Sequence, residues 1–66
     1  MKKLIKVDNG RYIVTDETGT TIALVYRCGN GYTRDIRNSC TGEFYRPEYF
    51  NYFKTLDAVK RRYDIK

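Results

Sequence analysis

The chain has no histidine, no tryptophan, a single proline and two cysteines among its 66 residues. The absence of histidine removes the commonest general base of enzyme catalysis. It also leaves Cys28 and Cys40 without the further Cys or His ligands that a structural zinc site needs. We therefore expect no catalytic residues, no metal and no cofactor, which directs attention to binding functions.

Long hydrophobic runs are also missing. The apolar pair Leu4-Ile5 is followed directly by Lys6, so the start of the chain lacks the apolar region of a secretory signal. No segment approaches the roughly 20 apolar residues that a membrane-spanning helix requires. If Tyr32–Arg37 is a strand, it carries the chain away from Cys28, which disfavours a disulfide with Cys40. We expect a cytoplasmic protein with two free thiols and no membrane partner.

Acidic residues are fewer than basic ones. The 13 Lys and Arg residues outnumber the 8 Asp and Glu residues, which gives a net charge of +5. In a small protein such an excess favours an anionic partner, with nucleic acid first. Many small soluble domains carry a similar charge for solubility alone, so the charge has to be considered together with the pattern of the chain.

The first half of the chain has the pattern of β-hairpins. Its turn signals are Asp8-Asn9-Gly10, Glu17-Thr18-Gly19 and Gly29-Asn30-Gly31. Asn-Gly supplies the positive φ angles that tight hairpin turns require. The segments between them are rich in β-branched and aromatic residues: Lys3–Val7, Arg11–Thr15, Thr20–Arg27 and Tyr32–Arg37. The pattern predicts a four-stranded antiparallel meander.

The turns also predict the register of this sheet. The expected cross-strand pairs are Val7 with Tyr12, Ile5 with Val14, Val14 with Ala23, Tyr12 with Val25 and Val25 with Ile36. One face would then be apolar, composed of Ile5, Val7, Tyr12, Val14, Ala23, Val25 and Ile36. The other would mix cations with aliphatic and aromatic groups: Lys6, Arg11, Ile13, Thr15, Ile22, Leu24, Tyr26, Thr33, Asp35 and Arg37. A slip of one residue would exchange the faces of a strand.

The last third of the chain has a different pattern. Residues 38–42 predict a loop, and residues 43–46 predict a short fifth strand that Pro47 ends. Thr55 is the expected N-cap of a helix whose apolar stripe is Leu56, Val59 and Tyr63. The expected fold is a single α+β domain over residues 1–66. In it, an antiparallel four- or five-stranded meander has one C-terminal helix packed on one face.

The mixed face is the first candidate nucleic-acid surface. Lys6, Arg11 and Arg37 can contact phosphates, and Tyr26 can stack on a base or bond a phosphate. Such a face can enter a DNA major groove or serve as a platform for single-stranded bases. Alternatively, its aliphatic residues mark a second buried layer, covered by the aromatic segment 44–53.

A basic cluster at the helix end is the second candidate. Lys60 and Arg61 belong to it, and they can anchor a phosphate. They are equally expected as solvated residues that complement the helix dipole, which favours cations at this end.

Aromatic residues are concentrated in one segment. Residues 44–53 contain Phe44, Tyr45, Tyr49, Phe50, Tyr52 and Phe53. We expect the phenylalanines in the core and at least one of Tyr45, Tyr49 and Tyr52 at the surface. Exposed tyrosines suit a protein interface because they combine contact area with a polar tip. Interleaved with Arg46 and Lys54, they could instead stack on nucleotides.

The end of the chain resembles that of a known class of DNA-binding domain. The matching residues are Phe53, Thr55, Val59 and Tyr63, after a run of strands. This pattern is similar to the three-stranded sheet-plus-helix domains of phage integrases (arm-type) and of plant ethylene-response-type factors. The resemblance implies that the sheet face away from the helix enters the DNA major groove, with Arg11, Tyr26 and Arg37 as base contacts. The chain departs from that pattern in its fourth strand and in segment 38–54.

The same ending resembles small uncharacterised phage and prophage proteins, which implies a mobile-element origin. The sequence thus predicts a non-enzymatic nucleic-acid-binding accessory or regulatory protein. The alternative is a protein-binding module, such as a phage-encoded inhibitor or adaptor of a host complex, that uses the tyrosine-rich surface. A homodimer without a ligand is the third possibility.

Overall fold

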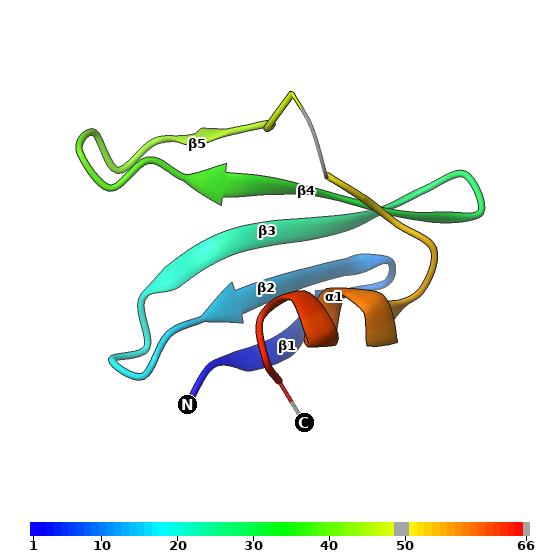
Figure 1. Ribbon diagram of the computed structural model, residues 1–66, viewed down its shortest axis with the longest axis horizontal. Coiled ribbons are helices and arrows are strands. Elements are labelled where there is room, and N and C mark those ends of the chain that lie inside the picture. The colour runs from blue at the N-terminus through cyan, green and yellow to red at the C-terminus, as the bar shows by residue number, and fades with distance from the viewer. Residues whose placement is uncertain (49–50, 66) are drawn as a thin grey trace.

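The protein is an antiparallel β-sheet with one short C-terminal helix, an α+β arrangement (Figure 1). The computed structural model describes residues 1–48 and 51–65. Its elements are β1 (Lys3–Asp8), β2 (Arg11–Thr15), β3 (Thr21–Cys28), β4 (Gly31–Arg37), β5 (Phe44–Tyr45), β6 (Tyr52–Phe53) and α1 (Leu56–Arg62). The predicted meander of the first strands is confirmed, since the sheet order is β1-β2-β3-β4-β5.

The outer edge of β4 is covered by two short segments instead of one strand. Strand β5 pairs with the end of β4 at Ile36 and Arg37, as the predicted fifth strand would. Strand β6 pairs with the beginning of β4 at Tyr32 and Thr33. The described residues of segment 44–53 therefore extend the sheet at its edge, and among them Arg46 and Tyr52 lie over part of its mixed face.

The register of the central hairpins decides which residues share a face. Val14 lies opposite Ala23 and Tyr12 opposite Val25, as predicted. Between β3 and β4 the turn is Gly29-Asn30, so Val25 lies opposite Arg34 and the predicted pairing of Val25 with Ile36 is wrong. Because the offset is two residues along β4, every side chain of β4 keeps its predicted face.

Strand β1 differs from the prediction by one residue. The observed pairs are Leu4 with Val14, Ile5 with Ile13, Lys6 with Tyr12 and Asp8 with Arg11. A bulge between Lys6 and Asp8 adds one residue to this strand, which reverses the alternation of the residues before it. The pairings predicted for Ile5 and Val7 are therefore wrong. Leu4 packs against the core, whereas Ile5 and Val7 are 42% and 61% exposed.

Alternation along the strands gives the sheet two faces. The inner face holds the fully buried Val14, Ala23 and Val25, and Val59 of α1 belongs to the same buried cluster. The outer face carries Arg11, Ile13, Leu24, Tyr26, Thr33, Asp35 and Arg37. Figure 1 shows the chain running from the β4 edge to α1, which lies in front of β1 and β2 in that view.

The helix begins where its sequence predicts, and the charges at its two ends are as expected. The Thr55 hydroxyl accepts a hydrogen bond from the backbone N–H of Ala58 at 3.2 Å, which confirms the N-cap. Asp57 lies in the first turn, while Lys60 and the two arginines after it lie in the last. Each charge therefore complements the helix dipole at its end of α1.

A buried arginine on the inner face joins the sheet to the helix. Arg34 is 5% exposed, and its guanidinium lies 5.4 Å from the ring centroids of both Phe53 and Tyr63. It also donates a hydrogen bond from Nη1 to the Tyr63 hydroxyl. A desolvated cation over aromatic rings is favourable by about 2 kcal/mol, so this contact is a strong link between β4 and the end of α1.

The phenylalanines divide between core and surface. Phe53 packs against the buried cluster as predicted. Phe44 is 37% exposed, so its predicted place in the core is wrong, because the two-residue β5 lies at the edge of the sheet. Phe50 lies outside the described residues.

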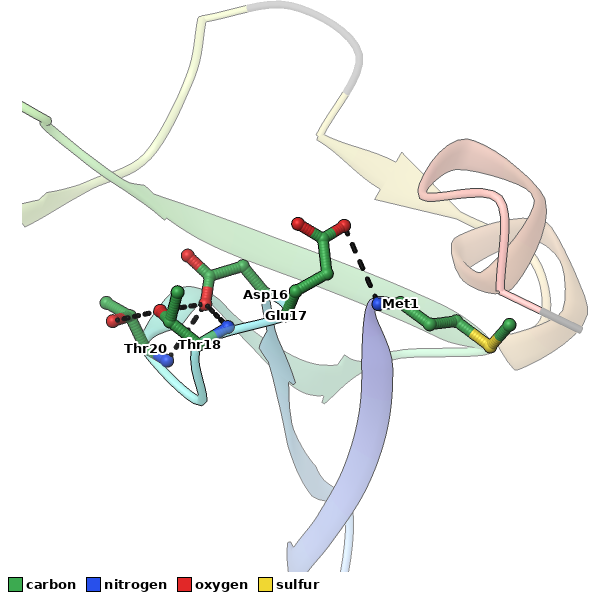
Figure 2. Close-up of polar contacts among 5 residues, drawn as sticks. All are labelled: Met1, Asp16, Glu17, Thr18 and Thr20. Atoms are coloured by element: carbon green, nitrogen blue, oxygen red, sulfur yellow. Dashed lines mark hydrogen bonds and ion pairs between the residues drawn. The ribbon is translucent and has the colours of Figure 1, made fainter.

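The turn between β2 and β3 is organised by one carboxylate (Figure 2). Asp16 Oδ1 accepts hydrogen bonds from the backbone N–H and the hydroxyl of Thr18, at 2.9 and 2.6 Å, and from the N–H of Thr20 at 3.0 Å. The Thr18 hydroxyl is the main reason that the pKa of Asp16 is below its usual value. Nearby, the amino terminus of Met1 lies 3.6 Å from Glu17.

Candidate nucleic-acid interface

The outer face carries three of the predicted contact residues, of which Arg11 and Tyr26 are direct neighbours. Arg11 and Tyr26 are direct cross-strand partners on β2 and β3. Arg37 lies on the same face at the end of β4, two strands from Arg11. Their common face follows from the register, because directly opposed residues of an antiparallel pair point to the same side.

The other three predicted contacts lie elsewhere. Lys6 is opposite Tyr12, so the β1 bulge moves it from its predicted place on the mixed face to the inner face. Lys60 and Arg61 lie on α1, whose Val59 belongs to the inner-face cluster. The six residues therefore do not form one surface.

A hollow lies on the sheet around Arg11 and Tyr26. It is open to solvent and has a volume of about 660 Å³. Ile13 and Leu24 supply an apolar floor, Val7 an apolar margin and Arg11 a cation, while Arg27, opposite Tyr32, borders the hollow from the inner face. None of the described residues that line it is acidic. The hollow therefore suits a ligand that combines negative charge with a flat apolar part.

The aliphatic residues of the outer face are not a second buried layer. Ile13 and Leu24 are half-buried, whereas Val14, Ala23 and Val25 on the inner face are fully buried, and the half-buried Ile22 packs against that cluster. An apolar floor that remains partly accessible, beside arginines, is typical of a binding surface.

Tyr26 is held by a polar cluster that the sequence analysis missed. Its hydroxyl donates a hydrogen bond to Asp35, and Arg46 Nε donates to the other oxygen of that carboxylate at 3.2 Å. The guanidinium of Arg46 lies over the Tyr26 ring, 5.6 Å from its centroid. Arg46 follows β5, so only the pairing of β5 with β4 brings it to this face.

The cluster of Tyr26, Asp35 and Arg46 adds no net negative charge to the outer face. Burial, and next the hydrogen bond to Asp35, raise the pKa of Tyr26 above its usual value, so the phenol stays neutral at neutral pH. Hydrogen bonding to Tyr26, and next to Asp35, raises the pKa of Arg46. The charge of Asp35 is therefore matched by a permanent cation.

The tyrosines of the alternative protein interface do not form one patch. Tyr45 and Tyr52 are 49% and 53% exposed, which confirms the prediction that at least one of these tyrosines is at the surface. Tyr45 lies opposite Ile36 on the inner face, and Tyr52 opposite Thr33 on the outer face. Tyr49 lies outside the described residues.

Cys28 and Cys40 are both free and exposed, as expected from their separation along the chain. Among residues 1–48 and 51–65, no helix is long and apolar enough to cross a membrane. Over the same residues, no group of three or more metal-ligating side chains occurs.

Comparison of the chain with protein-family models, with curated proteins and with solved structures found no match. The resemblance to integrase arm-type domains and to small phage proteins stays a prediction. The same is true of the base-contacting roles that it implies for Arg11, Tyr26 and Arg37.

Proposed function

We propose that this chain is a small non-enzymatic nucleic-acid-binding protein whose outer face contacts the ligand. The observation that carries this proposal is the hollow beside the Arg11–Tyr26 pair, which has an apolar floor, the guanidinium of Arg11 and no acidic lining residue. The net charge of +5 favours the same ligand, because a polyanion gains from each cation that it meets. An accessory or regulatory role in a phage or mobile element, in the cytoplasm, completes the proposal.

The proposal has helix α1 packed on the inner face, which leaves the outer face for the ligand. Two contacts support this arrangement. Val59 shares the buried cluster with Val14 and Val25, and Tyr63 accepts a hydrogen bond from Arg34 of the inner face.

Each residue of the outer face has a separate role. Arg11 and Arg37 bind phosphates, since arginine presents donors in a fork that matches phosphate oxygens. Tyr26 stacks on or positions the ligand. Lys6, Lys60 and Arg61 lie off this face, so they contribute only where a longer ligand continues around the molecule.

Fluorescence anisotropy with labelled DNA and RNA, titrated from low to high salt, tests the proposal. Affinity should fall linearly in a plot of log K against log salt concentration. The double variant R11A/R37A should bind more weakly and, for a single strand, lower the magnitude of the slope by about 1.4 because two phosphate contacts are lost. The variant K54A/R62A removes the same charge from exposed residues outside the outer face and should change the slope little.

Two results would reject the proposal. One is the absence of binding at the lowest salt concentration, where electrostatic attraction is strongest. The other is an equal loss of binding in both double variants, because net charge alone would then account for the affinity.

A protein interface at the β5–β6 edge is the second candidate function. The exposure of Phe44, Tyr45 and Tyr52 at this edge favours it. Aromatic-centred contacts predict a weak dependence on salt, in contrast to phosphate contacts. A partner captured by the wild type and lost with Y45A, at an affinity that salt barely changes, would support this function.

A homodimer without a ligand stays a prediction. Sedimentation over a concentration series tests it directly, since the mass of a dimerising chain rises with concentration.

A further inference from the structure

The site beside Arg11 is a recess, and this shape bears on whether the ligand is a single strand or a duplex. Its volume of about 660 Å³ lies within the roughly 300–1,000 Å³ typical of sites for small organic groups. A sheet that reads a duplex has to project its side chains into the groove, where base edges are displayed. A recess is instead suited to a base that has left the base stack of its own strand. Ile13 and Leu24 form an apolar floor for such a group.

The aromatic side chain at the hollow is already fixed in position. Tyr26 is held through its hydroxyl by Asp35 and across its ring by Arg46, while it also lines the hollow. Fixing a side chain before binding lowers the entropy lost on association. A stacking partner for a planar ring is therefore preorganised at the wall of the recess.

A cation lies where a nucleotide bound in the hollow would place its phosphate. Arg11 is the direct cross-strand neighbour of Tyr26 on the outer face. Arg27 also borders the hollow, but it lies opposite Tyr32, so its side chain belongs to the inner face. A phosphate attached to a base in the hollow would thus meet the guanidinium of Arg11. Asp8 is the cross-strand neighbour of Arg11 on its other side; its carboxylate accepts a hydrogen bond from the Asn9 N–H at 2.7 Å and does not line the hollow.

We infer that the hollow binds one unpaired base of a single-stranded nucleic acid, with Tyr26 as the stacking residue and Arg11 as the phosphate contact. This inference rests on the proposed function and specifies its ligand: a flexible single strand that can insert a base, in preference to a duplex. Stacking tolerates every base because each has a π-face, so the hollow selects an unpaired base without selecting its identity.

The first experiment changes the ligand and leaves the protein intact. Anisotropy is measured with a labelled 12-nucleotide single strand of DNA, the RNA of the same sequence, the matching DNA duplex, and a strand of the same length that carries abasic sites throughout. The abasic strand keeps the phosphates and removes every base. The inference predicts that the base-containing strands bind roughly 5- to 150-fold more tightly than the abasic strand, the range that corresponds to stacking of one base. The duplex should bind more weakly than the single strand, and the RNA arm decides which sugar is preferred.

The second experiment assigns the preference to Tyr26. Y26A should lower the affinity ratio of normal to abasic strand toward one, whereas Y26F, which keeps the ring, should retain most of that ratio. The ratio is the readout because any loss of folded protein affects both ligands equally. R46A serves as a positioning control: it should reduce the ratio less than Y26A, since it loosens the ring without removing it.

The outcomes separate this inference from the proposed function. If no nucleic acid binds at low salt, both are wrong. If the abasic strand or the duplex binds as tightly as the single strand, with salt-dependent loss in R11A/R37A, the outer face binds phosphates but the hollow holds no base. A preference for bases that survives in Y26A would place the stacking elsewhere and overturn the assignment to the hollow.

Discussion

At the residue scale, a glycine in the sheet is required by close packing. Gly31 is buried at the start of β4, and a Cβ there would lie 2.5 Å from both the Tyr52 hydroxyl oxygen and the Phe53 carbonyl oxygen. The Phe53 carbonyl cannot easily move, because β6 is paired to β4 there, whereas the Tyr52 hydroxyl ends a flexible, exposed side chain. The close approach of β6 to the sheet therefore depends on the absence of a side chain at residue 31.

Gly31→Ala should destabilise the fold by roughly 1–3 kcal/mol, the usual cost of overpacking a closed site. Equilibrium unfolding in urea measures this change. Gly31→Ala combined with Tyr52→Ala should recover part of the loss, since the phenol is removed while the Phe53 carbonyl remains. A stability within about 0.5 kcal/mol of wild type, as at an ordinary surface position, would show that β6 is not seated as described.

Asp16 gives the fold a pH dependence at the acidic end. Its pKa is lowered in the folded protein, chiefly by the Thr18 hydroxyl, so its ionised form favours folding. This stabilisation should be fully present above the unfolded pKa of about 3.8 and should be lost as pH falls through the lower folded value.

Urea unfolding of the wild type and of D16N at a series of pH values between neutral and strongly acidic isolates this contribution. The difference between the two proteins should be largest above the unfolded pKa and should shrink below it. A difference that stays constant across the acidic range would mean that Asp16 acts without its charge. Thr18→Val, which removes the hydroxyl donor, should reduce the same difference.

At the element scale, α1 depends on its cap. A seven-residue helix has little intrinsic stability in water, so the hydrogen bond from Ala58 N–H to Thr55 is a substantial part of what defines its start. Thr55→Ala should cost about 1 kcal/mol of unfolding free energy, while Thr55→Ser should cost little because the acceptor oxygen is kept. Equal losses in the two variants would contradict a capping role.

The junction of α1 with β4 is a second test at this scale. Tyr63→Phe keeps the ring beside Arg34 and removes the hydroxyl that accepts its hydrogen bond. A hydrogen bond to a charged group is worth about 1.5–3 kcal/mol, and we expect a loss of that size in urea unfolding. An unchanged midpoint would show that the cation–π contacts alone hold this end of the helix.

The elements also show where reasoning from the sequence succeeds and where it stops. The N-cap, the charges of the helix ends and the central hairpin follow from local patterns, and they are as predicted. The β1 bulge and the choice of Gly29-Asn30 as the turn depend on how neighbouring strands align, which residue types alone do not fix.

The candidate site was predictable to a similar extent. Alternation along β2 and β3 was sufficient to pair Arg11 with Tyr26. The fixing of Tyr26 by Asp35 and Arg46 was not, because it requires β5 to pair with β4 and return the chain to this face. The sequence did not predict the burial of Arg34 either, because a charged residue in a strand is expected at the surface unless its interaction partners are known.

At the scale of the whole molecule, the two faces of the sheet differ in burial, and the proposed function assigns ligand binding to the less buried one. The inner face holds the fully buried residues and the link to α1. The outer face is less buried, and beside Arg11 and Arg37 it carries the ion pair of Arg46 with Asp35. In a chain of 66 residues, one face of one sheet then supplies the core, and the proposed function uses the other.

The most direct test of this division is a residue-by-residue map of the ligand on the protein. Backbone amide chemical shifts of the labelled protein are followed by NMR as the 12-nucleotide single strand is added. The account predicts that the largest changes fall at Arg11, Ile13, Leu24, Tyr26 and Arg27, with little change at Val59 and Lys60 on α1. Changes concentrated on α1 or on the β5–β6 edge, or no changes at a saturating excess of the strand, would contradict it.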